Sequence, residues 1–427
     1  MLRDSLSKRD INEERPMSEP DPAVVEQLRE LLGERGVRIQ EDPVMPDVVL
    51  KPESTEQVSA ILRICSAAGQ ALVALGGKSG LANGHMQTGN EIGLSLELMN
   101  AIEEIDTVNR TMTVQAGCIL QVAADAAVEK ELLLPLDFGA RGSATIGGNV
   151  STNAGGNMVI RYGMVRDMVL GLEVVLADGT VVTSLNKMLK NNTGYDLNQW
   201  FIGAEGTLGV VTSVVLRLRP LPRSQNTALL AVDDFDSVSK LLTWLDSHTA
   251  GTLSAFEVMW PEFYEYITRE DSVHTPPLPH GSAHYVLVET LGSNPEADAE
   301  NFELVLGEAM EQGLVSDAVL TRSQAERNAI WEIRDDVLEF FKLGPFIPFD
   351  ISVTIENMES FIAEIRAGMK KVEEPICIVF GHLGDSNLHV LLGTRNADEF
   401  DYDALQTLLY DAVERYYGSV SAEHGIG

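Results

Sequence analysis

The chain has 427 residues, of which 44% are hydrophobic and 22% are charged, a composition typical of a globular protein long enough for two domains. Its formal net charge is −33, from 31 Lys and Arg against 64 Asp and Glu, which argues against binding to nucleic acid or to an anionic membrane surface. No apolar run approaches the roughly 18 residues of a membrane span, so we expect no transmembrane segment.

The N-terminal sequence MLRDSLSKRDINEERP is polar and carries both charge signs, unlike a secretory signal or a transit peptide. We therefore expect residues 1–40 to form a polar, partly disordered leader. The three cysteines, Cys65, Cys118 and Cys377, are far apart and form no CxxC pair. This spacing suits a reducing cytoplasm and excludes a zinc site built on cysteine, so we expect a cytoplasmic protein.

Residues 41–221 are expected to form a first α+β domain that is dense in glycine. The predicted elements, in chain order, are a helix over 56–69, a buried strand over 70–75, a half-buried strand over 111–117, a helix over 120–131 and a hairpin over 171–184. The hairpin turns at Asp178-Gly179, between two arms rich in valine.

Three glycine-rich segments interrupt this domain: GGKSGLANG (76–84), GSATIGGNVSTNAGG (142–156) and IGAEGTLGVVTSVVLRL (202–218). The first is no P-loop, because that pattern requires glycine where the chain has Leu72. Its backbone N–H groups could hold one anion, although an ordinary turn explains this loop better when it is taken alone. The second segment is too poor in apolar side chains to bury much area, and its glycines permit close approach to a ligand. Together the three segments predict a large ligand with phosphates and a ring system.

The Pro-bearing sequence RPLPRSQ (219–225) separates the first domain from a second α+β domain, expected over 222–420. Its predicted elements are helices over 233–248, 300–312 and 323–342 and strands over 283–292, 350–355 and 375–380. The helix over 323–342 opens with a capping box, Ser323-x-x-Glu326.

GHLGDSNLH (381–389) places two histidines on either side of a turn, so His382 and His389 can face each other. Near the end of the sequence, Glu423 and His424 add a carboxylate and a third imidazole. Two imidazoles and a carboxylate suit a divalent cation of the zinc type. From these residues alone, structural histidines with satisfied hydrogen bonds remain the competing interpretation.

Arg334 lies beside the apolar stripe of the helix over 323–342, and no carboxylate lies at a helical spacing from which it could pair. A half-buried guanidinium needs an anion. Either a salt bridge to another element or an external anion, such as a substrate carboxylate, meets that need.

The order and spacing of GGKSGLANG, IGGNVSTNAGG, KNNTGYDL (190–197) and IGAEGTLGVVT resemble the FAD domain of the vanillyl-alcohol-oxidase flavoprotein superfamily, also called the PCMH type. The resemblance covers roughly residues 40–427 and implies that FAD is the large ligand, with the α+β domain over 222–420 as the substrate (cap) domain. It implies these FAD-binding residues: Gly76, Gly77, Lys78, Ser79, Gly80, Leu81, Ser143, Ala144, Gly147, Gly148, Asn149, Asn153, Gly155, Val210 and Val211. Lys78 stands where members that bind FAD covalently often carry a histidine, so we expect non-covalent FAD.

Within that superfamily the chain is most similar to the D-2-hydroxy-acid dehydrogenase branch, through G-H-x-G-D-x-N-x-H followed by E-H-G-[IV]-G. The resemblance implies that His382, His389 and Glu423 bind a divalent metal, with zinc as the first choice, that His424 is the general base, and that Arg334 binds the substrate carboxylate. The reaction implied is oxidation of a small anionic 2-hydroxy acid to the 2-oxo acid, with hydride transfer to flavin N5. The electron acceptor is not implied, and homodimer formation stays open.

Three alternatives compete with this function. One is a metal-independent flavin oxidase, or a lipid-synthesis relative, on the same scaffold. A second is a catalytically silent FAD-binding subunit, because relatives continue beyond the position of Gly427 and residues 421–427 would be only the start of a segment that returns to the flavin site. The third is a dehydrogenase specific for D-2-hydroxyglutarate. We favour a neutral or apolar side chain, as in D-lactate, because Leu338, Pro348 and Leu391 stand where that enzyme has polar or cationic groups.

Overall fold

The computed structural model describes residues 20–39, 48–86 and 90–427, which form two compact units. Unit 1 consists of the described residues up to Gly156 together with Gly163–Leu221 and His424–Gly427, and unit 2 consists of Asn157–Tyr162 and Pro222–Glu423. Residues 1–19 of the expected leader lie outside the described residues, whereas residues 20–39 contain α2, η1 and β1.

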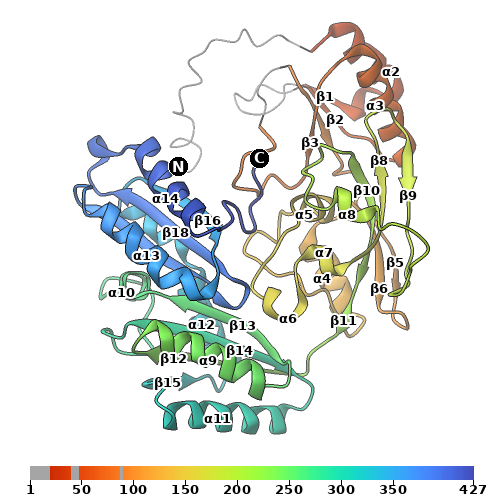
Figure 1. Cartoon of the computed structure of the whole chain (residues 1–427). Coiled ribbons are helices and arrows are strands. Elements are labelled where there is room, and N and C mark those ends of the chain that lie inside the picture. Colours follow the sequence, from red (N-terminus) through yellow and green to blue (C-terminus); the bar gives the residue numbers. More distant parts are fainter. Residues whose placement is uncertain (1–19, 40–47, 87–89) are drawn as a thin grey trace. The chain divides into compact units, whose positions relative to one another are not determined.

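Unit 1 contains short helices and three small sheets (Figure 1). Its elements are α2 (Pro22–Leu32), η1 (Glu34–Gly36), β1 (Val37–Ile39), β2 (Val48–Leu50), α3 (Thr55–Ala68), β3 (Leu72–Leu75), β4 (Ile92–Ser95), β5 (Ile102–Asp106), β6 (Thr111–Gln115), α4 (Leu120–Val128), β7 (Leu132–Leu133), α5 (Ile146–Thr152), α7 (Val165–Met168), β8 (Val169–Val175), β9 (Val181–Thr183), α8 (Asn198–Phe201), β10 (Val210–Arg217) and β11 (Arg219–Pro220).

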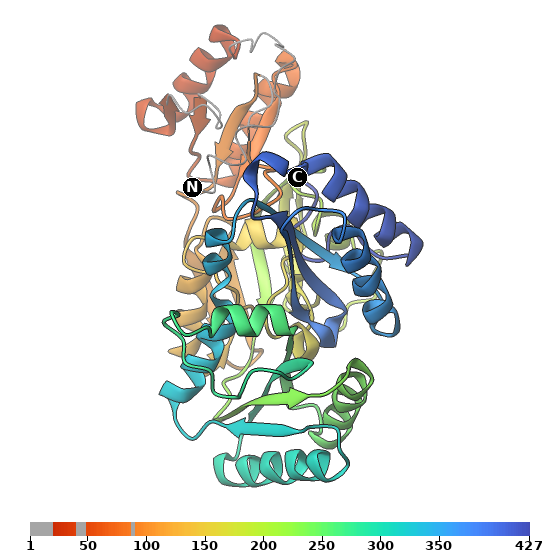
Figure 2. The ribbon, with the colours of Figure 1, turned by 90° about the vertical axis from the view of Figure 1, so that its left-hand side faces the viewer.

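The first sheet of unit 1 has the strand order β1-β2-β4-β3, with β2 and β3 both parallel to β4. Parallel strands require a crossover, and α3 provides it. The hydroxyl of Ser54 caps α3 by accepting a hydrogen bond from the N–H of Gln57, and Gly69 ends the helix in the left-handed region. Figures 1 and 2 show α2 and α3 beside these strands.

The second sheet is antiparallel and has the order β5-β6-β10-β8-β9, while β11 and β7 form a separate two-stranded pair. The hairpin of β8 and β9 turns at Asp178-Gly179, as the sequence predicts, with Gly179 at φ +82°. β6 is almost entirely buried and not half-buried, because α5 packs against it. β3 was predicted to be a buried strand, but most of its residues are only partly buried or exposed.

Unit 2 is built on one antiparallel sheet of seven strands, in the order β15-β12-β14-β13-β17-β18-β16. Its elements are α6 (Val159–Tyr162), β12 (Ser224–Val232), α9 (Phe235–His248), β13 (Leu253–Met259), α10 (Pro261–Ile267), β14 (His284–Gly292), α11 (Pro295–Glu311), β15 (Asp317–Leu320), α12 (Gln324–Asp335), η2 (Val337–Lys342), β16 (Phe346–Ser352), α13 (Ile355–Met369), β17 (Pro375–His382), η3 (Leu383–Asp385), β18 (Asn387–Thr394), η4 (Ala397–Glu399) and α14 (Tyr402–Arg415).

The two faces of this sheet carry separate hydrophobic cores, because alternate residues of each strand point to opposite faces. One face packs against α9, α11, α13 and α14, and its strand residues include Val258, Val379 and Val390. The other face packs against α10 and α12, and its strand residues include Met259, Phe380 and Leu391. Figure 1 shows α13 and α14 beside β16 and β18, and Figure 2 gives the view turned by 90°.

One predicted helix is shorter than expected. The capping interaction of Ser323 forms, since its hydroxyl accepts a hydrogen bond from the N–H of Glu326 at 3.2 Å. The α-helix nevertheless ends at Asp335, and residues 337–342 form the separate 3₁₀-helix η2. The sequence periodicity predicts that Leu338 lies one α-helical turn after Arg334. The structure differs, because Leu338 lies on η2, beyond the end of α12. Across the described part of the chain, no helix is both long and apolar enough to cross a lipid bilayer.

Candidate functional site

The loop Gly76–Gly80 of unit 1 follows β3 directly and passes through Lys78 at φ +56°. A Cβ atom on Gly77 would lie 2.0 Å from the carbonyl oxygen of Ser143, and one on Gly76 would lie 3.3 Å from the Cα atom of Gly148. Only glycine fits at position 77 without moving the backbone. The first two glycine-rich segments therefore lie against each other.

Residues 142–156 are not the loop that their composition predicts, because residues 146–152 form α5. The hydroxyl of Thr145 caps this helix by accepting a hydrogen bond from the N–H of Gly148 at 3.3 Å. Ile146 and Val150 are buried beneath the helix. Two apolar side chains, four residues apart, are enough to hold so short a helix against the sheet. The high glycine content of the segment hid this helix from the sequence-based prediction.

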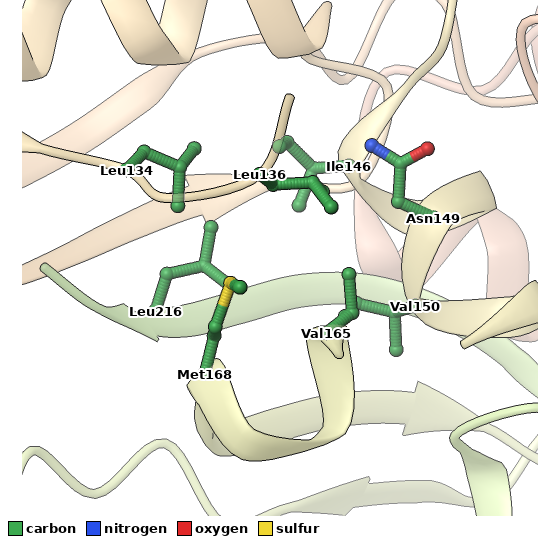
Figure 3. A pocket seen from close by; sticks show the side chains of 8 residues that line it. All are labelled: Leu134, Leu136, Ile146, Asn149, Val150, Val165, Met168 and Leu216. Atoms are coloured by element: carbon green, nitrogen blue, oxygen red, sulfur yellow. The ribbon is translucent and has the colours of Figure 1, made fainter. Parts of the chain in front are cut away.

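Figure 3 shows the apolar pocket under α5. Its lining residues are Leu134, Leu136, Ile146, Asn149, Val150, Val165, Met168 and Leu216. None of them is titratable, so this space belongs to the packing of α5 and not to a catalytic centre. Asn149 is the polar member, and its side chain extends away from Val165 and Met168 (Figure 3). Its buried Nδ2 has no hydrogen-bond partner among the described residues.

The third glycine-rich segment is hydrogen bonded to α5. The N–H of Gly203 donates to the carbonyl oxygen of Val150 at 3.0 Å, and the N–H of Glu205 donates to that of Ser151 at 2.8 Å. Beyond this turn, Val210 and Val211 pair with β8, while β6 joins β10 only from Ser213 onward.

The structure thus brings all three predicted FAD segments together in unit 1. Of the predicted residues, Gly76, Lys78, Gly80, Leu81 and Ser143 are exposed, Gly77, Ser79, Gly148 and Asn153 are partly buried, and Ala144, Gly147, Asn149, Gly155, Val210 and Val211 are buried. The close packing of the first two segments at Gly76, Gly77 and Gly148 and the unused amide donor of Asn149 fit a large ligand held mainly by backbone groups, as FAD would be.

In unit 2 the predicted histidine pair lies on a β-hairpin. β17 and β18 are antiparallel and turn through η3 and Ser386, which has φ +68°. The rings of His382 and His389 are 5.3 Å apart between centroids, at an interplanar angle of 81°. The two imidazoles face each other across the turn, as the sequence predicts.

Glu423 completes this cluster from the segment after α14. One ligand atom each from His382, His389 and Glu423 can be chosen so that all lie within 4.8 Å of one another. The distance between His382 Nε2 and Glu423 Oε1 is 4.0 Å. Two imidazole nitrogens and a carboxylate oxygen at this separation form a donor set that suits a divalent ion such as zinc.

Asp350 of β16 fixes the backbone that carries Glu423. Its Oδ2 accepts a hydrogen bond from the N–H of Glu423 at 2.7 Å, and its Oδ1 accepts one from Asn387 Nδ2 at 2.7 Å. The N–H of Ala422 donates to the carbonyl oxygen of Asp350 at 3.3 Å. Asp350 is 6% exposed, so these bonds form away from bulk water.

Glu257 of β13 is a second buried carboxylate in this cluster, and the sequence did not predict it. Its side chain is 1% exposed. Glu257 Oε1 lies 2.7 Å from His382 Nδ1, and Oε2 accepts a hydrogen bond from Arg334 Nε at 2.8 Å. The carboxylate therefore orients the imidazole so that Nε2 faces the cluster.

Charge in this network is strongly coupled. Burial lowers the pKa of His382, but Glu257 outweighs burial and raises that pKa to about 9. Burial raises the pKa of Asp385, which follows on the same turn, to about 7. The 3.1 Å contact between Arg334 Nη2 and His382 Nε2 needs an unprotonated Nε2, because a protonated nitrogen has no lone pair to accept the guanidinium N–H. A pKa of about 9 would leave His382 protonated at neutral pH, which disagrees with this contact. The contact describes the neutral imidazole, with the proton on Nδ1 toward Glu257, and this is also the form that binds metals.

Arg334 differs from its prediction. It is buried and not half-buried, and its partner among the carboxylates is Glu257 on another element, 77 residues away. Helical spacing could not reveal this pair because it joins α12 to β13. Nη1 lies 3.8 Å from Asp335, so the guanidinium already has a carboxylate, and any substrate carboxylate would be a second anion. His424 follows Glu423 directly and belongs to unit 1.

Glu257 and Asp350 are thus the residues that sequence reasoning missed at this site. Glu257 is the one charged residue in the strand sequence LSAFEVM (253–259), and a lone charge in an apolar strand was the available signal. Asp350 offers the same signal, because it is the one charged residue in the strand sequence FIPFDIS (346–352).

Comparison with known proteins gives two family matches. Residues 46–184 match the FAD binding domain, and residues 221–427 match the C-terminal domain of FAD linked oxidases. The chain is 37% identical over 419 residues to a probable mitochondrial D-2-hydroxyglutarate dehydrogenase of Oryza sativa subsp. indica, covering 94% of this chain and 74% of the relative. It is 38% identical over 381 residues to mitochondrial D-2-hydroxyglutarate dehydrogenase of Bos taurus, covering 89% and 70%. A putative mitochondrial D-lactate dehydrogenase of Schizosaccharomyces pombe is 36% identical, with coverage of 89% and 74%.

Solved structures support the predicted fold class. Alkyldihydroxyacetonephosphate synthase aligns with a TM-score of 0.74 at 15% identity, covering 95% of this chain and 82% of the other. The 4-ethylphenol oxidase of Gulosibacter chungangensis aligns with a TM-score of 0.72 at 18% identity, covering 96% and 91%. At such low identity these matches show a shared fold and nothing about substrate.

The expected cytoplasmic location is wrong on these comparisons, because the relatives from rice, cattle and fission yeast are named as mitochondrial. Widely spaced reduced cysteines fit more than one reducing compartment and could not distinguish between them. The predicted fold class is confirmed: an α+β FAD-binding domain of the vanillyl-alcohol-oxidase type with a second α+β domain. With both family models matched in order and relatives aligned over most of its length, the chain belongs to the FAD-dependent D-2-hydroxy-acid dehydrogenases, a family of oxidoreductases.

Proposed function

We propose that this protein oxidises a D-2-hydroxy acid to the 2-oxo acid and passes the two electrons to FAD. One observation carries the proposal: His382, His389 and Glu423 converge within 4.8 Å, on the sheet face that also bears Arg334 and Glu257, in a chain of this family. We assign FAD binding to the domain over 41–221 and substrate binding to the domain over 222–420.

FAD would be held without a covalent bond by the three glycine-rich segments of unit 1. Gly76, Gly77 and Gly148 let the first two segments pack against each other, which would place their backbone groups side by side for the cofactor, and Asn149 offers a buried amide donor. Lys78 replaces the histidine expected in a covalent site. FAD, when bound, supplies the acceptor for the hydride equivalent.

The side chains of unit 2 would hold a divalent cation and the substrate. His382 through Nε2, His389 and Glu423 would be the ligands, while Glu257 holds the His382 tautomer and Asp350 holds the Glu423 backbone. The cation, when bound, makes a nearby substrate hydroxyl easier to deprotonate. His424 would accept that proton.

Arg334 would bind the substrate carboxylate. Its Nε is committed to Glu257, which fixes the plane of the guanidinium, so the Nη atoms are its available donors. Nη2 now contacts His382 Nε2. Since Nε2 has one lone pair, a cation ligated there excludes this hydrogen bond and leaves Nη2 to the substrate.

The substrate side chain is proposed to be neutral or apolar, as in D-lactate. Pro348 and Leu391 are cross-strand partners on β16 and β18, two residues from the pair Asp350 and His389, a distance of roughly 7 Å along the strands. Neither offers a charge or a donor from its side chain to a distal carboxylate, and an unpaired polar group costs roughly 1–3 kcal/mol. Leu338, the third departure, lies on η2 and is 64% exposed, so it adds little to this argument.

D-2-hydroxyglutarate is the second candidate substrate, because relatives at 37–38% identity bear that name. The two candidates are separated by kcat/KM measured with D-lactate and D-2-hydroxyglutarate, using an artificial electron acceptor. A preference of more than tenfold for D-2-hydroxyglutarate overturns the neutral side chain and leaves the reaction class intact.

The reaction class is tested by anaerobic mixing of the purified yellow protein with a panel of D- and L-2-hydroxy acids. We expect a D-acid to bleach the flavin absorbance within one turnover and chelation to suppress the bleaching. A yellow protein that no 2-hydroxy acid reduces contradicts the proposed function and favours a silent FAD-binding subunit. Reduction that persists in metal-free protein favours a metal-independent oxidase.

A further inference from the structure

The segment after His424, which belongs to unit 1, is bound by the carboxylate of Glu205 in the same unit. Glu205 Oε1 accepts a hydrogen bond from the N–H of Ile426 at 2.9 Å, and Oε2 accepts one from the N–H of Gly427 at 3.0 Å. A carboxylate that accepts two successive backbone N–H groups fixes both the position and the direction of the segment.

Glu205 is itself held firmly. Its backbone lies in the left-handed region at φ +50°, which costs a residue other than glycine of order 1 kcal/mol or more. Its N–H donates to the carbonyl oxygen of Ser151 at 2.8 Å, at the end of α5. The carboxylate is therefore connected to the helix that contains Gly147, Gly148 and Asn149.

The glycines of the segment allow this contact. A Cβ atom on Gly425, at φ +78°, would lie 2.7 Å from Glu205 Oε1. A Cβ atom on Gly427, at φ +79°, would lie 1.9 Å from the carbonyl oxygen of Ala82 in the first glycine-rich segment. Ile426 between them is 80% exposed, so burial of its side chain does little to hold the segment.

We infer that Glu205 is a positioning residue for His424, setting where the imidazole lies relative to the FAD-binding segments. The inference rests on the proposed function, in which His424 is the base. His424 is two residues from the first N–H that Glu205 binds, and both belong to unit 1. Loss of the two hydrogen bonds loosens the segment beside His424, and a misplacement of about 1 Å can reduce a rate roughly 10²-fold.

The experiment compares flavin reduction in Glu205→Ala and wild-type holoenzyme, by anaerobic stopped flow with whichever D-2-hydroxy acid reduces the wild type fastest. We expect the limiting rate to fall roughly 10- to 100-fold, with the half-saturating substrate concentration and the FAD content nearly unchanged. Glu205→Gln keeps one acceptor oxygen and should recover part of the rate. Gly425→Ala, which displaces the carboxylate from the other side, should be slow like Glu205→Ala.

Asp106→Ala is the matched control. Asp106 Oδ1 also accepts two backbone N–H groups, those of Val108 and Asn109, both at 2.9 Å, and it lies in the same unit. Its loss should leave the reduction rate unchanged. Amide hydrogen exchange gives a readout that is independent of turnover: Glu205→Ala should speed exchange at Ile426 and Gly427, and Asp106→Ala only at Val108 and Asn109.

A double-mutant cycle with His424→Ala separates the two ideas. If Glu205 acts through His424, Glu205→Ala should slow the His424→Ala enzyme no further, within about twofold. Two outcomes overturn the positioning role of Glu205 and leave His424 as the base. One is a slow His424→Ala enzyme together with a Glu205→Ala enzyme as fast as wild type. The other is a double variant in which the two reductions in rate multiply. A His424→Ala enzyme with the wild-type rate overturns the base, and the positioning role with it.

Discussion

The candidate sites of the two units are built from different materials. In unit 1 the glycine-rich segments offer mainly backbone groups to the proposed ligand. Their packing is limited most by the need for positions without a side chain, such as Gly77. In unit 2 buried charged side chains make the site, and the tightest constraint is that each charge has its partner, as with Glu257, His382 and Arg334. Substitutions should therefore damage the first site through volume and the second through charge.

The largest expected effect tests the constraint on volume. Gly77→Val should give a colourless protein, because its Cβ would lie 2.0 Å from the carbonyl oxygen of Ser143 and no flexible side chain can yield. The measurement is flavin absorbance per protein after purification. Gly139→Ala is the control, since a Cβ there meets nothing within 4 Å, and it should stay yellow. Full flavin content in Gly77→Val contradicts the placement of the first loop.

His382→Ala tests the proposed ligands in the other unit. We expect substrate-driven flavin reduction to fall at least roughly 10³-fold while FAD stays bound, because the cation loses a ligand and Glu257 loses its imidazole. Metal content by elemental analysis should fall in parallel. His248→Ala removes an exposed histidine from the same unit and should change neither quantity. Active wild-type enzyme without any bound divalent ion would falsify the whole ligand set.

Glu257→Gln tests whether the charge that holds His382 matters, and not only the shape. Loss of such an orienting carboxylate typically weakens metal affinity roughly 10- to 100-fold, which a competition titration with a chelator measures. Glu289→Gln is matched: Glu289 is also a buried strand glutamate, bonded to Trp331 Nε1 at 3.1 Å and lying 3.6 Å from Arg327. Both variants should lose stability, since Glu257→Gln leaves the buried Arg334 poorly paired and Glu289→Gln weakens the pairing of the partly buried Arg327. Equal metal affinity in the two variants contradicts the orienting role.

His284 sharpens the comparison from the opposite face of the same sheet. It is buried between Phe235 and Trp260, and neither ring nitrogen has a hydrogen-bond partner among the described residues. Burial and the nearby Arg366 lower the pKa of His284 to about 4. Buried histidines on one sheet thus shift in opposite directions, according to whether a carboxylate accompanies them.

The sign of the resulting pH dependence follows from this lowered pKa. Below pH 6.5 the imidazole of the unfolded chain is protonated, whereas the imidazole of the folded protein stays neutral down to about pH 4. The free energy of unfolding therefore falls as the pH falls through that range. The full loss is about 3 kcal/mol. Urea unfolding of wild type and His284→Leu between pH 4 and 7 should show the stability of the wild type falling relative to that of the variant as the pH is lowered, by up to about 3 kcal/mol. A constant difference between the two contradicts the buried neutral imidazole.

Local features of the fold were predictable from the sequence. The Asp178-Gly179 turn and the Ser323 cap each depend on residues a few positions apart, and both form as predicted. The end of α12 at Asp335 was missed, because no glycine or proline follows before Gly344. α5 was missed for the opposite reason, since glycines argue against helix while burial of Ile146 and Val150 decides in its favour.

The candidate site was predictable only where its residues are close in sequence or carried by a family pattern. His382 and His389 are separated by one turn, and the structure brings them together. The pair of Glu257 and Arg334 spans 77 residues and depends on the docking of α12 against β13. The contact of Glu257 with His382 depends on the register between β13 and β17. A single sequence contains no direct record of such a register, so the prediction left Arg334 with two open alternatives.

The segment that carries Glu423 has a further consequence for the strand beside it. β16 is the last strand of the seven-stranded sheet, and Ser352 exchanges backbone hydrogen bonds with Ser419 at 3.0 and 2.8 Å, while Ala422 bonds to Asp350. An open strand edge is a template on which another chain can add a strand and start aggregation. By lying along β16, residues 419–422 occupy part of that template. Detachment of residues 419–423 would therefore expose this part of the strand edge as well as remove a proposed ligand, so the same segment serves the site and covers an edge open to self-association.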